Sequence, residues 1–247
     1  MIPNPIHKVL STFQNCGVRA LLMGGQACVF YGAAEFSRDT DFALNADAAT
    51  LERLNVALRE LNASVIAVPP LSLEHLERGH AVHFRCQHPD AAGLRVDVMA
   101  RMRGVAAFPE LWNRRTVLQG EDGTIYELLS LPDLVQAKKT QRDKDWPMIR
   151  RLMEADRVGC QGPPSAGQIQ LWLREGRTPA LLVDLARQFP EQAASMAAGF
   201  RPLLHAALQG DEALVETGLA EEERAERAAD RAYWSPLKKE LERMRHA

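Results

Sequence analysis

The chain has 247 residues and a mass of 27.5 kDa, with 30 lysine and arginine residues against 32 aspartate and glutamate residues. A hydrophobic fraction of 46% and a charged fraction of 25% are typical of a globular protein and exclude a disordered, collagen-like or coiled-coil chain. The formal net charge of −2 argues against a protein that binds nucleic acid by overall basicity, although it leaves room for a local basic patch.

Three sequence features bear on the compartment of the protein. No window of about 18 apolar residues is free of charge, so we expect no transmembrane helix. The N-terminus has no basic stretch followed by an apolar core, so we expect no secretory signal. The four cysteines are scattered without a CxxC pair, at Cys16, Cys28, Cys86 and Cys160. We therefore expect a cytoplasmic protein with free thiols and no membrane partner.

The first part of the chain alternates helical and strand-like patterns. Apolar residues at helical spacing, and short apolar runs bounded by glycine or polar residues, predict helices at 6–15, 26–32 and 48–61 and strands at 18–23, 39–44 and 65–68. Two hairpins follow, formed by strands 81–86 and 94–99 around the turn 89–93, and by strands 116–118 and 124–129 around 120–123. Helices are then predicted at 130–139, where Ser130 and Asp133 have the spacing of a capping box, and at 145–155.

A segment rich in glycine and proline, residues 159–167, marks the predicted domain boundary. After it the sequence has almost no strand pattern and predicts helices at 165–174, 179–188, 191–208, 211–219 and from 221 through 233 to the C-terminus. We therefore predict an α/β (α+β) domain with a small mixed sheet over residues 1–158, and an all-helical domain over residues 159–247.

Two aspartates carry the first chemical signal. Asp39 and Asp41 are two residues apart on a predicted strand, so both carboxylates lie on one face, with Cα atoms about 6.5–7 Å apart. Like charges this close repel, which makes the pair unfavourable unless a cation lies between them. Carboxylate oxygens together with substrate phosphates are typical Mg²⁺ ligands. Because isolated Asp-x-Asp pairs are common in surface loops, the neighbouring motifs must decide whether this pair binds a metal.

Two further features supply that context. Gly24 and Gly25 follow a predicted buried strand and precede a helix; such a turn either exposes backbone N–H groups to a phosphate or is a tight turn without a ligand. Asp97 lies between two valines in a strand-like run, where a carboxylate is either solvated or works on a metal. Three carboxylates on neighbouring strands could bind two metal ions for phosphoryl transfer, and the third could serve as a general base.

The order of these motifs resembles the polymerase-beta-type nucleotidyltransferase superfamily, and most of all its bacterial minimal and abortive-infection-toxin-like members. The resemblance rests on Gly24-Gly25 after the strand, on Arg38-Asp39-Thr40-Asp41 and on Arg95-Val96-Asp97-Val98, and it covers residues 18–152. It implies a nucleotidyltransferase fold, two Mg²⁺ ions and a nucleoside triphosphate donor such as ATP.

The resemblance also implies a role for each matching residue. The metal-binding and catalytic positions fall on Asp39, Asp41 and Asp97, of which Asp97 is the base. The positions that contact the triphosphate fall on Gly24, Gly25, Arg38, Lys138 and Lys139. Either lysine could instead be a solvated residue at a helix end, and Arg38 could only cap the strand. Gly25 stands where many members have serine, which leaves phosphate binding to backbone N–H groups.

The predicted reaction moves a nucleoside monophosphate from the triphosphate onto an acceptor hydroxyl of tRNA, protein or a small molecule, with release of pyrophosphate. The resemblance extends to toxin–antitoxin and phage-defence proteins, so the partner could be a cognate toxin or antitoxin. Two alternatives stay open: a non-catalytic, antitoxin-like regulatory module with the same fold, and an antibiotic nucleotidyltransferase. Four histidines lie within a short span without metal-site spacing, and we interpret them as chance or as lining a substrate: His75, His80, His83 and His88.

Overall fold

The computed structural model describes residues 4–120 and 123–246, and it confirms an α/β fold with a helical C-terminal part. The described chain divides into two compact units. The sheet unit contains the chain up to Phe30, residues Ala34–Ala137 and the residues from Tyr233 onward. The helical unit contains Tyr31–Ala33 and Lys138–Ala232.

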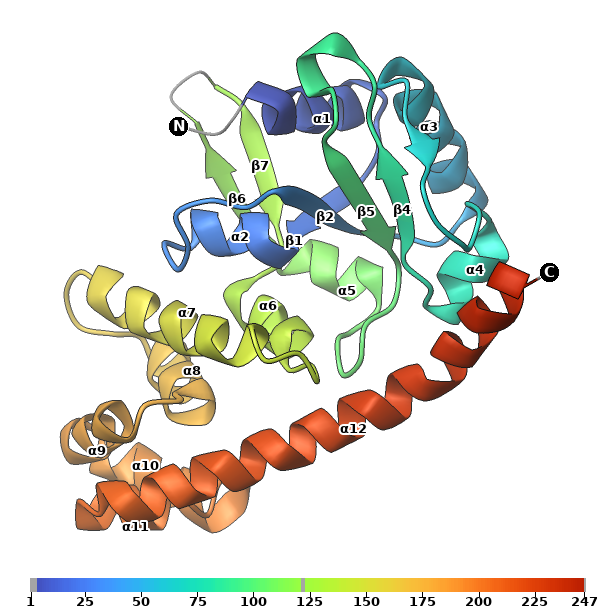
Figure 1. Cartoon of the computed structure of the whole chain (residues 1–247). Coiled ribbons are helices and arrows are strands. Elements are labelled where there is room, and N and C mark those ends of the chain that lie inside the picture. The colour runs from blue at the N-terminus through green and yellow to red at the C-terminus, as the bar shows by residue number, and fades with distance from the viewer. Residues whose placement is uncertain (1–3, 121–122, 247) are drawn as a thin grey trace. The chain divides into compact units, whose positions relative to one another are not determined.

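The sheet of the first unit is mixed (Figure 1). In the described part of the chain its strands are β1 (Ala20–Met23), β2 (Asp39–Leu44), β3 (Ser64–Val65), β4 (Val82–Arg85), β5 (Arg95–Met99), β6 (Thr116–Gln119) and β7 (Ile125–Leu128). Their order is β3-β4-β5-β2-β1-β7-β6, with β2 parallel to β5 and β1 parallel to β7, and with antiparallel pairing elsewhere. Both predicted hairpins, β4–β5 and β6–β7, are confirmed, although residues 121–122 of the second turn lie outside the described residues.

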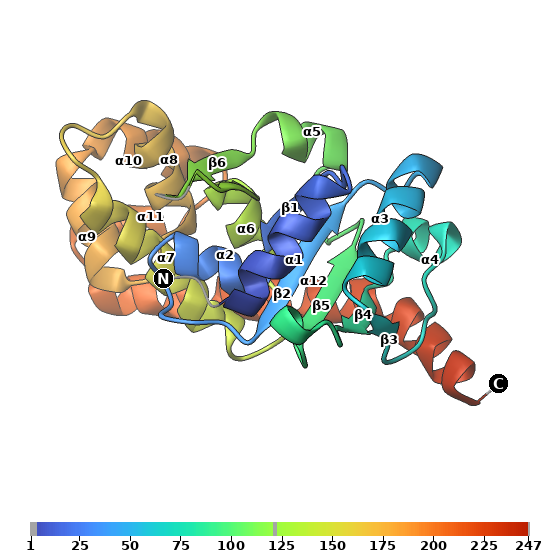
Figure 2. The same cartoon turned by 90° about the horizontal axis from the view of Figure 1, so that it is seen from above.

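The helices of the sheet unit are α1 (Asn4–Asn15), α2 (Gly24–Phe30), α3 (Ala48–Glu60), α4 (Leu73–Arg78), α5 (Phe108–Asn113) and α6 (Leu131–Lys138), with a 3-10 turn at Pro89–Ala91. Helices α1 and α3 lie on one face of the sheet (Figure 2). There the ring of Phe13 packs on Phe42 of β2, with centroids 4.7 Å apart. Val96 and Val98 of β5 are fully buried, and alternation turns Asp97 between them toward the opposite face.

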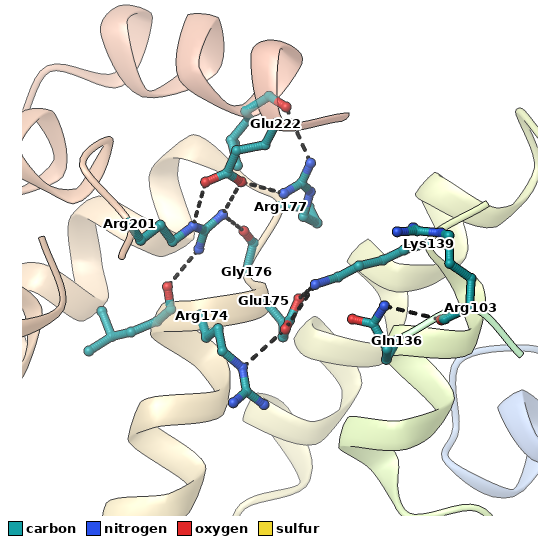
Figure 3. A network of polar contacts seen from close by, with 11 residues as sticks. Arg103, Gln136, Lys139, Arg174, Glu175, Gly176, Arg177, Arg201 and Glu222 are labelled. Atoms are coloured by element: carbon teal, nitrogen blue, oxygen red, sulfur yellow. Dashed lines mark hydrogen bonds and ion pairs between the residues drawn. The ribbon is translucent and has the colours of Figure 1, made fainter. Parts of the chain in front are cut away.

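The helical unit comprises α7 (Asp145–Gly159), α8 (Ala166–Glu175), α9 (Pro179–Gln188), α10 (Pro190–Gly199), α11 (Leu204–Gln209) and the first part of α12 (Glu212–His246). The helix predicted at 191–208 is interrupted, because Arg201 leaves the helix to donate to the carbonyl oxygens of Leu173 and Gly176 and to pair with Glu222 (Figure 3). The break predicted at residue 220 was wrong: nothing there stops a helix, and α12 continues through it. Within the described residues, no helix has the length and apolarity that a membrane span requires.

The boundaries between the two units differ from the predicted boundary at 158/159, since the chain passes from the sheet unit to the helical unit at Ala137/Lys138 and returns at Ala232/Tyr233. Helix α7 belongs to the helical unit, where Trp172 donates to Asp156 at 2.6 Å and Arg157 pairs with Asp184 at 3.1 Å. The last part of α12 belongs to the sheet unit, because Glu240 accepts from the buried His80 at 2.8 Å. Both assignments depend on polar contacts between residues that are far apart in the sequence. Helical periodicity, which is a local pattern, does not predict such contacts.

Candidate active site

The register of three neighbouring strands gathers the predicted carboxylates on one face of the sheet. Asp41 of β2 is the register partner of Asp97 on the parallel strand β5, and Asp39 lies opposite Arg95. On the other side of β5, His83 of β4 is the register partner of Asp97. Because neighbouring strands lie about 4.7–4.9 Å apart, these side chains form one row across the sheet. The structure thus brings together the three aspartates that the sequence singled out.

Gly24, the first residue of α2, lies directly against Asp41. Gly24 has φ +66°, and a Cβ atom built on it would lie 1.9 Å from Oδ2 of Asp41. A Cβ atom on Gly25 would lie 2.6 Å from the hydroxyl oxygen of Ser37. Both glycines therefore let the backbone approach the carboxylate and the loop before β2 closely. Asp39 and Arg38, at the start of β2, are exposed to solvent.

Asp97 is held by two hydrogen bonds to one of its oxygens. Its Oδ1 atom lies 2.9 Å from Nδ1 of His83 and 2.8 Å from Nε of Arg95, and its side chain is 14% exposed. Burial favours the neutral acid, but the hydrogen bonds and charges of His83 and Arg95 outweigh it, and the pKa of Asp97 lies below its ordinary value of 3.8. Asp97 is therefore ionised at neutral pH, as both a metal ligand and a general base must be.

Arg95 is the cation that the sheet itself supplies to this site. Its pKa is raised, first by the hydrogen bond to Asp97 and further by the charges of Asp97, Asp39 and Asp41. All three carboxylates therefore stabilise the positive charge of the Arg95 guanidinium group. The donors fit a divalent cation in their oxygen chemistry and in their placement on one face. As they stand, no three acidic, histidine or cysteine side chains of the described chain converge into a metal-binding group.

The two lysines predicted to contact phosphate belong with the helical unit. Lys138, at the end of α6, is buried, and its Nζ lies 3.2 Å from Oδ1 of Asp145. Nζ of Lys139 lies 2.8 Å from Oε2 of Glu175, which also accepts from Arg174 (Figure 3). Each lysine is thus paired with a carboxylate inside its own unit. The contact of either lysine with a triphosphate stays a prediction.

Comparison with known proteins adds no family to this geometry. No family model and no curated protein matches the chain.

The role of His83 at this site was not predicted from the sequence. Antiparallel pairing of the predicted strands 81–86 and 94–99, aligned end to end, would have placed His83 opposite Asp97 and so on the same face. The direct pairing of His83 with Asp97 depends on the short 3-10 turn at Pro89–Ala91. In this turn the backbone N–H of Asp90 donates to Nδ1 of His88. The other two histidines lie elsewhere, where His75 contacts the carbonyl oxygen of Pro70 and the ring of His80.

Proposed function

We propose that the protein is a metal-dependent nucleotidyltransferase, which transfers a nucleoside monophosphate from a nucleoside triphosphate to an acceptor hydroxyl. The observation that supports this most is the pairing of Asp41 with Asp97 across parallel strands, with Asp39 on the same face and the Gly24 turn against Asp41. A row of carboxylates beside the closely approaching glycines at the start of α2 suits a substrate that brings both phosphates and cations.

The residues have distinct roles in this proposal. Asp39, Asp41 and Asp97 would hold two divalent cations such as Mg²⁺, which supply positive charge to the attacking and leaving oxygens when bound. Backbone N–H groups of Gly24 and Gly25 would bind the β- and γ-phosphates, and Arg38 is exposed beside the carboxylates.

The reaction breaks one bond and forms one. The acceptor oxygen attacks the α-phosphorus while the bond from that phosphorus to the pyrophosphate oxygen breaks, and pyrophosphate leaves with the electron pair. The proton of the acceptor hydroxyl passes to the carboxylate of Asp97, which is ionised and therefore able to take it. Arg95 would remain close enough to offset the charge that gathers on this face.

A labelling screen tests the proposal and identifies the acceptor class. The protein is incubated with Mg²⁺ and each α-labelled triphosphate, and with total tRNA, candidate partner proteins or aminoglycosides. We expect label on one acceptor class, and loss of labelling in Asp41→Asn. The control is Glu52→Gln, which removes an exposed carboxylate on α3 and should label like the wild type. The non-catalytic alternative predicts no label on any acceptor, and the antibiotic-modifying alternative predicts label on the small molecules alone.

A further inference from the structure

The two carboxylate oxygens of Asp97 differ in their hydrogen bonding. Both donors, Nδ1 of His83 at 2.9 Å and Nε of Arg95 at 2.8 Å, reach Oδ1. Within residues 4–120 and 123–246, Oδ2 has no hydrogen bond. A carboxylate fixed by one oxygen presents the other in a single orientation. This is the arrangement by which groups around a metal ligand orient it toward the ion.

His83 reaches Asp97 from a strand of its own. It lies on β4, directly opposite Asp97 in the antiparallel β4–β5 ladder, and its side chain is 26% exposed. Arg95 lies on the same strand as Asp97, two residues before it, and its Nη2 lies 3.0 Å from Nδ1 of His83. The imidazole and the guanidinium thus hold Asp97 from two directions. A carboxylate held by a single neighbour would be free to rotate about its Cβ–Cγ bond.

We infer that His83 is a positioning residue, which holds Oδ1 of Asp97 so that Oδ2 faces the ligand of the carboxylate row. The inference rests on the proposed function, because it assumes that Asp97 binds a cation. His83 does not touch the cation or the reacting atoms in this assignment. It acts through Asp97, and only its Nδ1 position matters.

The dependence on Nδ1 allows a test with two matched substitutions. In His83→Asn the side-chain amide N–H takes the place of Nδ1, where it can donate to Asp97. In His83→Gln the amide extends to the place of Nε2, away from Oδ1. His83→Ala removes both positions. His205→Ala removes an exposed histidine of the helical unit and serves as the control.

The measurement is the affinity of each full-length protein for Mn²⁺ alone, followed by electron paramagnetic resonance. We expect His83→Asn and His205→Ala to bind within about threefold of the wild type, and His83→Gln and His83→Ala to bind about 10–100-fold more weakly. Circular dichroism of each variant confirms that it is folded.

Three results would overturn the inference. Wild-type affinity in both His83→Gln and His83→Ala would show that Asp97 needs no support from His83. Equal weakening of His83→Asn and His83→Ala would show that the imidazole binds the ion itself. Absence of Mn²⁺ binding by the wild type would remove the cation site on which the proposed function rests, and the inference with it. The first two results leave the proposed function standing.

Discussion

Asp41 and Asp97 stand opposite each other on parallel strands, although two helices, two strands and a 3-10 turn separate them along the chain. Two like charges at this spacing raise each other's pKa unless positive groups offset them. Arg95 and His83 supply that offset at Asp97, whose pKa is lowered rather than raised. The sheet therefore keeps Asp97 charged beside a second carboxylate, which is typical of a functional site.

Gly24→Ala should damage this site more than a comparable substitution elsewhere in the sheet unit. The new Cβ atom would lie 1.9 Å from Oδ2 of Asp41, and the residue would have to keep φ +66°. Gly93→Ala is the matched control, since Gly93 has φ +79° and no atom within 4 Å of the new Cβ. We expect Gly93→Ala to lower the free energy of unfolding by about 1 kcal/mol. Gly24→Ala should lower it by roughly 1 kcal/mol more and abolish label transfer.

Urea unfolding and the labelling assay measure both effects of these glycine substitutions. Equal losses of stability in the two variants, with label transfer retained in Gly24→Ala, would show that the turn does not need to approach Asp41.

Asp145 should stabilise the helical unit in a pH-dependent way. Its side chain is 1% exposed, and burial opposes ionisation, but Lys138, Thr140 and Arg142 outweigh burial and hold its pKa below the ordinary value of 3.8. Because the folded pKa is depressed, the stabilisation is present above the unfolded pKa and is lost as the pH falls through the folded pKa. At pH 7, Asp145→Asn should lower the free energy of unfolding by about 3 kcal/mol.

Unfolding curves between pH 7 and pH 3 test this sign. The gap between Asp145→Asn and the wild type should narrow below about pH 4. Asp143→Asn removes a fully solvated carboxylate of the same segment, 99% exposed, and should change stability by less than about 1 kcal/mol. A gap for Asp145→Asn that stays constant or widens toward pH 3 would contradict the assignment.

Cys86 should resist alkylation in the folded protein. All four cysteines are free, as predicted, and Cys86 is 1% exposed. Burial raises the pKa of its thiol to about 11. Since only the thiolate reacts, roughly 0.1% of Cys86 is reactive at pH 8. Cys160 is only partly buried, so iodoacetamide should modify it at least about tenfold faster.

Peptide mapping by mass spectrometry gives the two rates of alkylation, and urea should make them equal. Equal rates in the folded protein would mean that β4 and its neighbours open to solvent far more often than this packing allows.

The sequence predicted the components of the site better than their connections. The period-2 run of Asp39–Leu44 and the hydrophobic strand around Asp97 carry their own signal, so both strands, and the shared face of Asp39 and Asp41, followed from local patterns. The pairing of β2 with β5 is non-local, and nothing in either strand encodes it. The short helices α4 and α5 were not predicted, since each has only six residues.

The same limit explains the remaining differences. The return of α12 to the sheet unit depends on Glu240 meeting His80 and Arg78, which are far away in the sequence. The pairing of Lys138 with Asp145 depends on the turn between α6 and α7. The sequence did not distinguish His83 from the three neighbouring histidines, because its role depends on the strand register that places it beside Asp97.

The position of the label on the triphosphate decides whether the carboxylate row transfers a nucleotide. Two parallel reactions contain Mg²⁺, the acceptor that the screen identifies, and triphosphate labelled at either the α- or the γ-phosphate. We expect α-label to become attached to the acceptor and γ-label to be released as pyrophosphate. Asp39→Asn, Asp41→Asn and Asp97→Asn should each abolish the transfer, while Glu52→Gln should not. Transfer of γ-label, or transfer of α-label that survives Asp41→Asn, would contradict nucleotide transfer by the carboxylate row.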